Sequence, residues 1–270
     1  MHRAKKSLGQ NFLRSGSALR AIVDAGAVVP SDTVLEIGPG KGALTEALLE
    51  TGAKVIAVEK DWELIPYLQE KFAQKISEGK FELIEKDVLL FSPKEIGLSL
   101  GAYKLIANIP YYITGAILEK FLEEETRPER IVFLVQKEVA DRIVARDKKE
   151  SILSISVKAF GIPKVVMKVS KKAFSPSPKV DSAILIIGNI SHEYFATWNI
   201  PIKQAIREFF DIIHVGFAHK RKLLARNLEY GVSKEIISKS FAELGLPISA
   251  RAEDISPLEW LALAKLLSQK

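Results

Sequence analysis

The chain has 270 residues, of which 47% are hydrophobic and 27% charged, enough for one large domain or a medium domain followed by a small one. It has no cysteine, which excludes disulfides and thiol chemistry, and its four histidines show no zinc-ligand spacing, so we expect no metal. The formal net charge of +6 is compatible with a nucleic-acid partner.

Neither end of the chain shows a membrane signal. No apolar run approaches the roughly 20 residues that a membrane helix needs. The N-terminus is basic, but no apolar signal segment follows it. We therefore expect a soluble, cytoplasmic protein without a membrane partner. No feature of the sequence demands a dimer, and we expect a monomer.

The first predicted elements alternate between strand and helix. Residues 33–37 form an apolar run that ends at a glycine turn, residues 43–50 read as a helix, and residues 54–59 as the next strand. Asp61 is the predicted N-cap of the helix that follows, in which Leu64, Ile65, Leu68 and Phe72 mark one face.

The later apolar runs continue this alternation. Strands are predicted at 81–86, 103–107 and 131–135, which favours a parallel sheet covered on both faces. Residues 164–169 and 180–187 are then joined by a short segment with no helix between them, as expected for an antiparallel pair at the sheet edge. The fold class is therefore α/β, with a mostly parallel sheet and an antiparallel edge pair.

The strand pattern stops near residue 190. The remaining residues look helical, and Trp260, Leu263, Ala264 and Leu267 form an amphipathic stripe at helical spacing. We place a domain boundary there, giving a first domain at 1–189 and a small, all-helical C-terminal domain at 190–270.

The turn after the first of these strands carries glycines at 38, 40 and 42. A strand–glycine turn–helix unit presents free backbone N–H groups and allows a ligand to approach closely. A dinucleotide fingerprint would need its third glycine at position 43, which is Ala43, and a P-loop would need Ser or Thr after Lys41. Phosphate-centred ligands are thus disfavoured, and the loop suits a cofactor with a zwitterionic amino-acid tail.

Polar residues end the next three strands. Glu59 lies 21 residues after Gly38, the offset at which an acid accepts hydrogen bonds from ribose hydroxyls. Asp87 can accept from an adenine amine, and Asn108 ends the following strand. Either acid alone could be a solvated turn residue. The ordered set of four, all on the carboxyl edge where open α/β sheets bind ligands, favours a cofactor site.

The segment Asn108-Ile109-Pro110-Tyr111 is suited to holding a purine amine. The side-chain oxygen of Asn108 and the carbonyl of Ile109 are two acceptors for its hydrogens, while Pro110 fixes the turn and removes a competing donor. Tyr111 supplies a flat face for the base. Its alternative interpretation is a core aromatic beside a turn.

Taken together, these motifs resemble those of the small-subunit ribosomal RNA adenine N6,N6-dimethyltransferases. The resemblance extends over nearly the whole sequence, through the glycine loop, the 108–111 turn and two further motifs, Lys6-Ser7-Leu8-Gly9-Gln10-Asn11-Phe12-Leu13 and Phe174-x-Pro176-x-Pro178-Lys179-Val180-Asp181-Ser182. It implies a Rossmann-like class I methyltransferase domain and a small helical domain. It also implies transfer of methyl groups from S-adenosyl-L-methionine to two adjacent adenosines near the 3′ end of small-subunit RNA, with a role in ribosome biogenesis.

The resemblance also implies site residues. Cofactor contacts carry over to Asn11, Leu13, Gly38, Glu59, Asp87 and Asn108. Contacts to the target base carry over to Asn108, Tyr111 and Phe174, with Phe174 stacking a flipped adenine against Tyr111. One departure is visible: Tyr112 stands where many bacterial members carry Asn, which alters the outer wall of the expected pocket.

A basic cluster in the C-terminal region, Lys220, Arg221, Lys222 and Arg226, is the predicted RNA-facing surface. A solvated helix face is the alternative. Lys5 and Lys6 are a second candidate basic patch near the mouth of the site.

Other functions stay open on this sequence. A large-subunit RNA adenine methyltransferase of the macrolide-resistance type would share the glycine loop and the Asn-x-Pro-Tyr turn. A DNA adenine methyltransferase is disfavoured, since no target-recognition domain is evident. A ribosome-assembly or transcription accessory factor of the same fold would use binding rather than catalysis.

Overall fold

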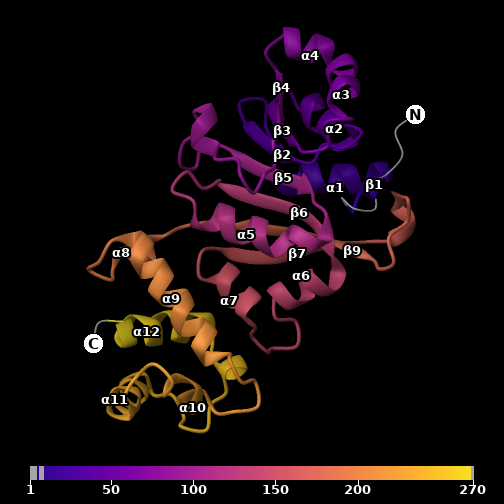
Figure 1. The fold of residues 1–270 in the computed structure, drawn as a ribbon. Coiled ribbons are helices and arrows are strands. Elements are labelled where there is room, and N and C mark those ends of the chain that lie inside the picture. The colour runs from indigo at the N-terminus through magenta and orange to yellow at the C-terminus, as the bar shows by residue number, and fades with distance from the viewer. Residues whose placement is uncertain (1–4, 6–8, 269–270) are drawn as a thin grey trace. The chain divides into compact units, whose positions relative to one another are not determined.

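The computed structural model describes Lys5 and residues 9–268. Its main feature is a seven-stranded sheet in the order β4-β3-β2-β5-β6-β9-β7 (Figure 1). The strands are β2 (Thr33–Ile37), β3 (Lys54–Glu59), β4 (Phe81–Glu85), β5 (Lys104–Asn108), β6 (Arg130–Gln136), β7 (Ile162–Val169) and β9 (Ser182–Gly188).

The pairing confirms the predicted fold class. Strands β4, β3, β2, β5 and β6 run parallel to one another, whereas β9 is antiparallel to both β6 and β7. All seven strand predictions agree with the observed bounds to within two residues. None of the helices that the structure describes has the length and apolarity needed to cross a bilayer.

The central strands of the sheet are buried on both faces, whereas the edge strands β4 and β7 are partly exposed. Val34 and Leu35 point to opposite faces of β2 and each is 0% exposed, and the same holds for Leu105 and Ile106 of β5. Near-continuous apolar runs are typical of parallel strands covered by helices on both sides. The covering helices include α1 (Gly16–Gly26), α2 (Ala43–Glu50), α3 (Ile65–Lys71), α4 (Ala73–Ser77) and α5 (Thr114–Glu123).

Three local features were not foreseen. Helix α1 begins after Ser15, whose side chain accepts the backbone N–H of Ala18, and it buries Ala18 and Ile22. A second, two-stranded sheet pairs β1 (Phe12–Leu13) with β8 (Phe174–Ser175). The predicted N-cap at Asp61 is wrong: the N-cap of α3 is Leu64, and Asp61 is a buried residue with partners of its own.

The contacts divide the chain into two units. The first, here the sheet unit, comprises Met1–Ala140 and Ile162–Ile190; the second, here the helical unit, comprises Asp141–Gly161 and Ser191–Lys270. The first unit thus ends close to the predicted boundary at 190. Residues 141–161, which the sequence placed in the first domain, group with the C-terminal helices instead. Helix α6 (Lys137–Ile143) spans this division.

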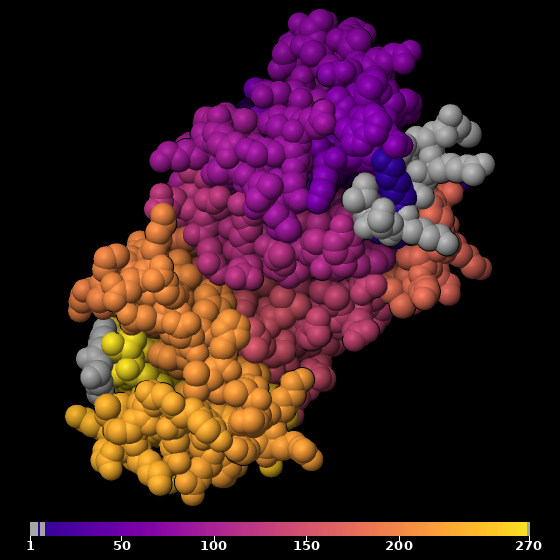
Figure 2. Space-filling model, viewed as in Figure 1, coloured from indigo at the N-terminus to yellow at the C-terminus, as the bar shows by residue number. Residues whose placement is uncertain are grey.

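The helical unit has its own aromatic core. Its main helices are α7 (Ile152–Lys158), α8 (Glu193–Ala196), α9 (Ile202–Gly216), α10 (Leu224–Leu228), α11 (Lys234–Leu244) and α12 (Pro257–Ser268). The space-filling view shows α9 to α12, in orange to yellow, packed against one another (Figure 2). Trp260, Leu263, Ala264 and Leu267 are buried, as the helical stripe predicts.

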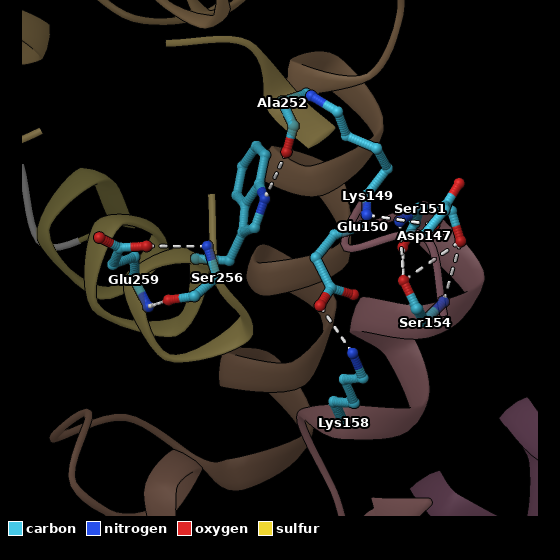
Figure 3. A network of polar contacts seen from close by, with 10 residues as sticks. Asp147, Lys149, Glu150, Ser151, Ser154, Lys158, Ala252, Ser256 and Glu259 are labelled. Atoms are coloured by element: carbon cyan, nitrogen blue, oxygen red, sulfur yellow. Dashed lines mark hydrogen bonds and ion pairs between the residues drawn. The ribbon is translucent and has the colours of Figure 1, made fainter. Parts of the chain in front are cut away.

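Residues 147–161 belong to the helical unit through apolar packing, in which Phe160 lies against Phe195 and Phe210, and through polar contacts. Lys149 pairs with Asp254, and the backbone N–H of Glu150 donates to the carbonyl of Glu253. Lys158 Nζ donates to the Glu150 carboxylate at 2.6 Å (Figure 3). The indole N–H of Trp260 donates to the carbonyl of Ala252 at 3.1 Å. Pairing with a turn about 100 residues away is invisible to local sequence patterns.

Candidate active site

A cavity of about 460 Å³ opens at the carboxyl edge of the sheet unit. It lies where β4, β3, β2 and β5 end, beside the point at which the strand order reverses, the usual ligand position in open α/β sheets. The predicted residues that line it are Asn11, Leu13, Gly38, Glu59, Asp87, Asn108, Ile109 and Tyr111.

The glycine loop supplies left-handed backbone and close approach rather than free N–H groups. Gly38, Gly40 and Gly42 have φ of 64°, 57° and 75°. Their N–H groups donate within the protein, to Val58 O, Glu59 Oε2 and Pro39 O, so the expectation of free donors at these glycines is wrong. A Cβ on Gly42 would lie 2.5 Å from the Phe72 ring, whereas a Cβ on Gly38 would meet nothing within 4 Å. Gly38 therefore leaves space for a ligand.

Glu59 is a buried carboxylate at the end of β3, 6% exposed. Burial raises its pKa, and hydrogen bonds from the backbone N–H groups of Asp61 and Gly40 oppose that shift. A third backbone N–H, that of Lys60, also donates to the carboxylate. Of the four lone-pair positions on the two carboxylate oxygens, one is left for a hydroxyl donor. The geometry is compatible with the predicted ribose contact.

Asp61 anchors the N-terminal segment that forms one wall of the cavity. Its carboxylate is 1% exposed and accepts hydrogen bonds from Lys5 Nζ and Gln10 Nε2, both at 2.7 Å. Burial alone would raise the pKa of Asp61, but the bonds from Lys5 and Gln10 lower it overall. Lys5 is therefore engaged with Asp61 rather than available as a basic patch, and Lys6 lies outside the described residues. We name these three residues the Lys5–Gln10–Asp61 cluster.

Asp87 follows β4, and its surroundings favour the ionised form of its carboxyl group. The ammonium of Lys60 lies 2.6 Å from Oδ2 and lowers the pKa of the carboxyl group, with the backbone N–H of Leu89 as a second donor at 3.0 Å. Leu89 and Val88 also line the cavity. An anionic acceptor beside two apolar side chains suits a base carrying an exocyclic amine.

Asn108 is oriented by its own amide group. Nδ2 donates to the backbone oxygen of Asn11 at 3.2 Å, which joins the end of β5 to the N-terminal segment. Within the described part of the chain Oδ1 has no hydrogen-bond partner. The carbonyl of Ile109 is likewise without one among these residues. Two acceptors are thus available beside the cavity.

Tyr111 begins a short 3₁₀ turn, η3 (Tyr111–Ile113), after Pro110. Its hydroxyl is 2.8 Å from Ser182 Oγ on β9, and burial raises its pKa. The hydrogen bond fixes the ring with its body in the cavity wall. Phe174 is not among the lining residues: it is 5% exposed and pairs with Leu13 in the small sheet.

Glu36 was not singled out from the sequence, although it lies two residues before Gly38 and contributes to the cavity wall. It is 1% exposed, and burial raises its pKa to about 8, against a hydrogen bond from the Thr45 hydroxyl at 2.7 Å. The sequence offered one signal for a buried carboxyl group with a hydrogen-bond donor: an acid within an apolar strand, followed nine residues later by a hydroxyl side chain.

The predicted RNA-facing residues lie in the helical unit and differ in their contacts. Lys220, Arg221, Lys222 and Arg226 are all exposed. Arg226 pairs with Glu229 at 3.1 Å, and Lys222 Nζ lies 3.1 Å from the hydroxyl of Tyr230. The backbone carbonyl of Arg221 accepts a hydrogen bond from the guanidinium of Arg251. The guanidinium of Arg221 itself takes no part in that bond.

Comparison with known proteins gives full-length similarity. The family model described as "Ribosomal RNA adenine dimethylase" matches residues 1–269. A protein named "Ribosomal RNA small subunit methyltransferase A" from Dehalococcoides mccartyi is 43% identical over 97% of this chain and 87% of its own length. A protein of the same name from Thermosynechococcus vestitus is 38% identical, over 100% and 98%.

Solved structures give the same fold. A dimethyladenosine transferase from Plasmodium falciparum superposes with a TM-score of 0.77 at 26% identity, over 93% of this chain and 95% of that one. The 23S rRNA methyltransferase ErmE superposes with a TM-score of 0.73 at 25% identity, over 96% and 100%.

Proposed function

This chain belongs to the ribosomal RNA adenine dimethylase family, and on that premise we propose its reaction. It transfers methyl groups from S-adenosyl-L-methionine to N6 of two adjacent adenosines near the 3′ end of small-subunit ribosomal RNA, giving N6,N6-dimethyladenosine. The observation that carries the proposal is the shared cavity, which places the ends of β4, β3 and β2 beside the Asn108–Tyr111 turn.

The residues of the cavity fit S-adenosyl-L-methionine. Glu59 would hold the ribose hydroxyls, Asp87 the adenine amine, and the space at Gly38 the amino-acid tail, with Asn11 and Leu13 closing the N-terminal side. A volume of about 460 Å³ lies in the range of small-molecule sites. When bound, the cofactor would supply a methyl carbon on a positively charged sulfur; the amine nitrogen would bond to that carbon, and the neutral thioether, S-adenosylhomocysteine, would be the leaving group.

The Asn108–Tyr111 turn would prepare the target amine. The nitrogen lone pair of adenine is delocalised into the ring, which makes the amine a poor nucleophile. Oδ1 of Asn108 and the carbonyl of Ile109 would accept its two hydrogens and favour a pyramidal nitrogen with a directed lone pair. Tyr111 would stack the base, and Phe174 would take part after moving from its buried position. Positioning of the amine beside the methyl group, rather than proton removal by a strong base, would account for the rate.

The partner is proposed to be small-subunit RNA within an immature small subunit, in the cytoplasm, with the enzyme acting as a monomer. The sheet unit would perform the methyl transfer. The helical unit would face the RNA through Lys220, Arg221, Lys222 and Arg226, whose exposure supports phosphate contact.

Mass spectrometry of small-subunit RNA tests the reaction. Unmethylated small subunits are incubated with the protein and S-adenosyl-L-methionine, and the 3′ terminal fragment is analysed. We expect a mass gain of four methyl groups, two on each adenosine. Absence of N6,N6-dimethyladenosine in the product would overturn the proposal.

A large-subunit target is the alternative that the similarity to ErmE favours. Against it, the relatives at 38–43% identity are named small-subunit methyltransferases. Parallel reactions with naked large-subunit RNA and with small subunits decide between the two. Methylation of only the large-subunit RNA would establish the alternative.

An assembly role could coexist with catalysis. Asn108→Ala removes one amine acceptor and leaves the exposed basic residues of the helical unit intact. If this variant docks on immature subunits and restores their maturation, binding is a function in its own right. If it docks but maturation stalls, methylation itself is required.

A further inference from the structure

Tyr112 is an exposed aromatic side chain at the rim of the cavity. It follows Tyr111 on the η3 turn and lines the same cavity, yet it is 65% exposed, whereas Tyr111 is partly buried. Its hydroxyl forms no hydrogen bond with any residue that the structure describes. The side chain therefore has no evident structural partner for its hydroxyl, and its ring remains available to a ligand.

One side of the Tyr112 ring lies close to Gly9 of the N-terminal segment. A Cβ built on Gly9 would lie 3.2 Å from Cε1 and 3.3 Å from Cδ1 of Tyr112, and 3.5 Å from Cβ of Pro110. Gly9 has a φ of 61°, which disfavours any larger residue there. The backbone of the N-terminal segment thus packs against one side of the ring and leaves the rest open. A rigid aromatic loses little conformational entropy when it binds a ligand.

The surroundings of Tyr112 favour a nucleic-acid ligand. Lys41, Lys60 and Lys86 line the same cavity. Lys60 and Lys86 pair with Asp87 and Glu95, whereas Lys41 lies over the Phe12 ring at 5.0 Å and pairs with no acid among the described residues. A lysine without an acid partner beside an exposed aromatic ring suits single-stranded RNA, which proteins bind through phosphate attraction and base stacking.

We propose that Tyr112 is the stacking platform for the nucleotide directly next to the target adenosine. The inference rests on the proposed function, in which the two substrate adenosines are adjacent. When one base enters the cavity beside Tyr111, its covalently attached neighbour stays at the mouth, where Tyr112 is exposed. Contacts to flanking nucleotides are a usual source of substrate choice in base-flipping enzymes.

Stacking on an aromatic face tolerates any base, so the ring can hold the neighbouring nucleotide whether or not that base is already methylated. Tyr112 is in this sense a residue that determines substrate positioning, without contact to the reacting nitrogen.

Kinetics with small subunits test the role. Tyr112→Ala is expected to raise KM for unmethylated small subunits about 5- to 150-fold, the effect of losing one base stack, with kcat and the Kd for S-adenosyl-L-methionine unchanged. Tyr112→Phe and Tyr112→Trp should stay within about threefold of the parent, because the ring and not the hydroxyl acts. The control is Tyr67→Ala, which removes a tyrosine that is 45% exposed outside the cavity lining.

An unchanged KM in Tyr112→Ala, or an equal defect in Tyr112→Phe, would overturn the inference while leaving the reaction established. A second measurement does not depend on turnover: anisotropy of a labelled single-stranded RNA with two adjacent adenosines, titrated with protein and S-adenosylhomocysteine. If the parent protein methylates no small subunits, the proposed function fails. The platform then stands only if Tyr112→Ala still weakens RNA binding about 5-fold or more, and it fails otherwise.

Discussion

The side-chain amide of Asn108 donates a hydrogen bond to the backbone oxygen of Asn11, 3.2 Å away. This bond joins the end of a central strand to the N-terminal segment across the cavity wall. It also decides which end of the Asn108 side chain is available, because the amide is engaged and the oxygen is not.

Asn108→Ala should lower kcat for methyl transfer to small subunits about 100- to 1,000-fold, as removal of one positioned polar group does at other active sites. Asn108→Asp should be no better, since a carboxylate oxygen would face the Asn11 carbonyl without a proton to donate. Methyl incorporation measures the rate, and urea unfolding serves as the folding control. A variant that keeps more than about a tenth of the rate would contradict the acceptor role.

The Tyr111–Ser182 hydrogen bond should contribute modestly and as a pair. Tyr111→Phe and Ser182→Ala are each expected to lower kcat/KM about 2- to 12-fold, and the double variant should be no worse than either single one. Tyr111→Ala also removes the aromatic face on which the base stacks, so kcat/KM for this variant should fall about 5- to 150-fold. Additive losses in the double variant would show that the two hydroxyls act independently.

Glu36 makes the stability of the protein depend on pH. Its pKa is raised to about 8 in the folded state from an ordinary value of 4.5, so folding takes up a proton between these values. The free energy of unfolding should therefore fall as pH rises, by about 1.4 kcal/mol per pH unit relative to Glu36→Gln, and level off above about 8. The glutamine keeps an acceptor for the Thr45 hydroxyl. Urea unfolding of both proteins from pH 5 to 9 measures the difference, and parallel curves would refute it.

Asp61 should matter for cofactor binding although it does not line the cavity. Asp61→Asn weakens two charge-dependent hydrogen bonds that hold the N-terminal wall, so the Kd for S-adenosyl-L-methionine should rise about tenfold. Glu63→Gln is the matched control, because Glu63 also pairs with Lys5 but its side chain is 43% exposed. Calorimetric titration distinguishes them, and equal affinities would argue against the anchoring role.

The basic residues of the helical unit should differ in their contribution to subunit binding. Lys220→Ala and Arg221→Ala should each reduce the slope of log K against log salt by about 0.7–0.9. Arg226→Ala should have less effect, because its guanidinium already pairs with Glu229 at 3.1 Å. Lys234→Ala and Lys239→Ala, exposed on α11, are the charge-matched controls. An unchanged slope for Lys220 and Arg221 would place the RNA elsewhere.

The sheet was predictable because its central strands are buried on both faces and read as apolar runs, such as Val34-Leu35 in β2. The order of strand ends then placed Gly38, Glu59, Asp87 and Asn108 around one cavity. What local patterns could not supply are contacts between distant segments. Asp61 looks like an N-cap until Lys5 and Gln10 are seen to bind it.

The same limit applies to Phe174 and to residues 141–161. Phe174 follows a recognisable motif, yet its pairing with Leu13 buries it away from the cavity lining. Residues 141–161 look like a continuation of the strand–helix alternation, but their contacts, among them the packing of Phe160 on Phe195, group them with the helical unit. Both outcomes depend on tertiary partners that sequence spacing does not reveal.

The reversal of strand order between β2 and β5 divides the cavity into two sides. The residues proposed to hold the methyl donor lie mainly at the ends of β4, β3 and β2, whereas the turn proposed to hold the acceptor base follows β5. Asn108 belongs to both sides, because it is proposed to contact cofactor and base and its amide also holds Asn11. A laboratory selection for new acceptors would therefore do best to keep Asn108 and to randomise the positions that follow it.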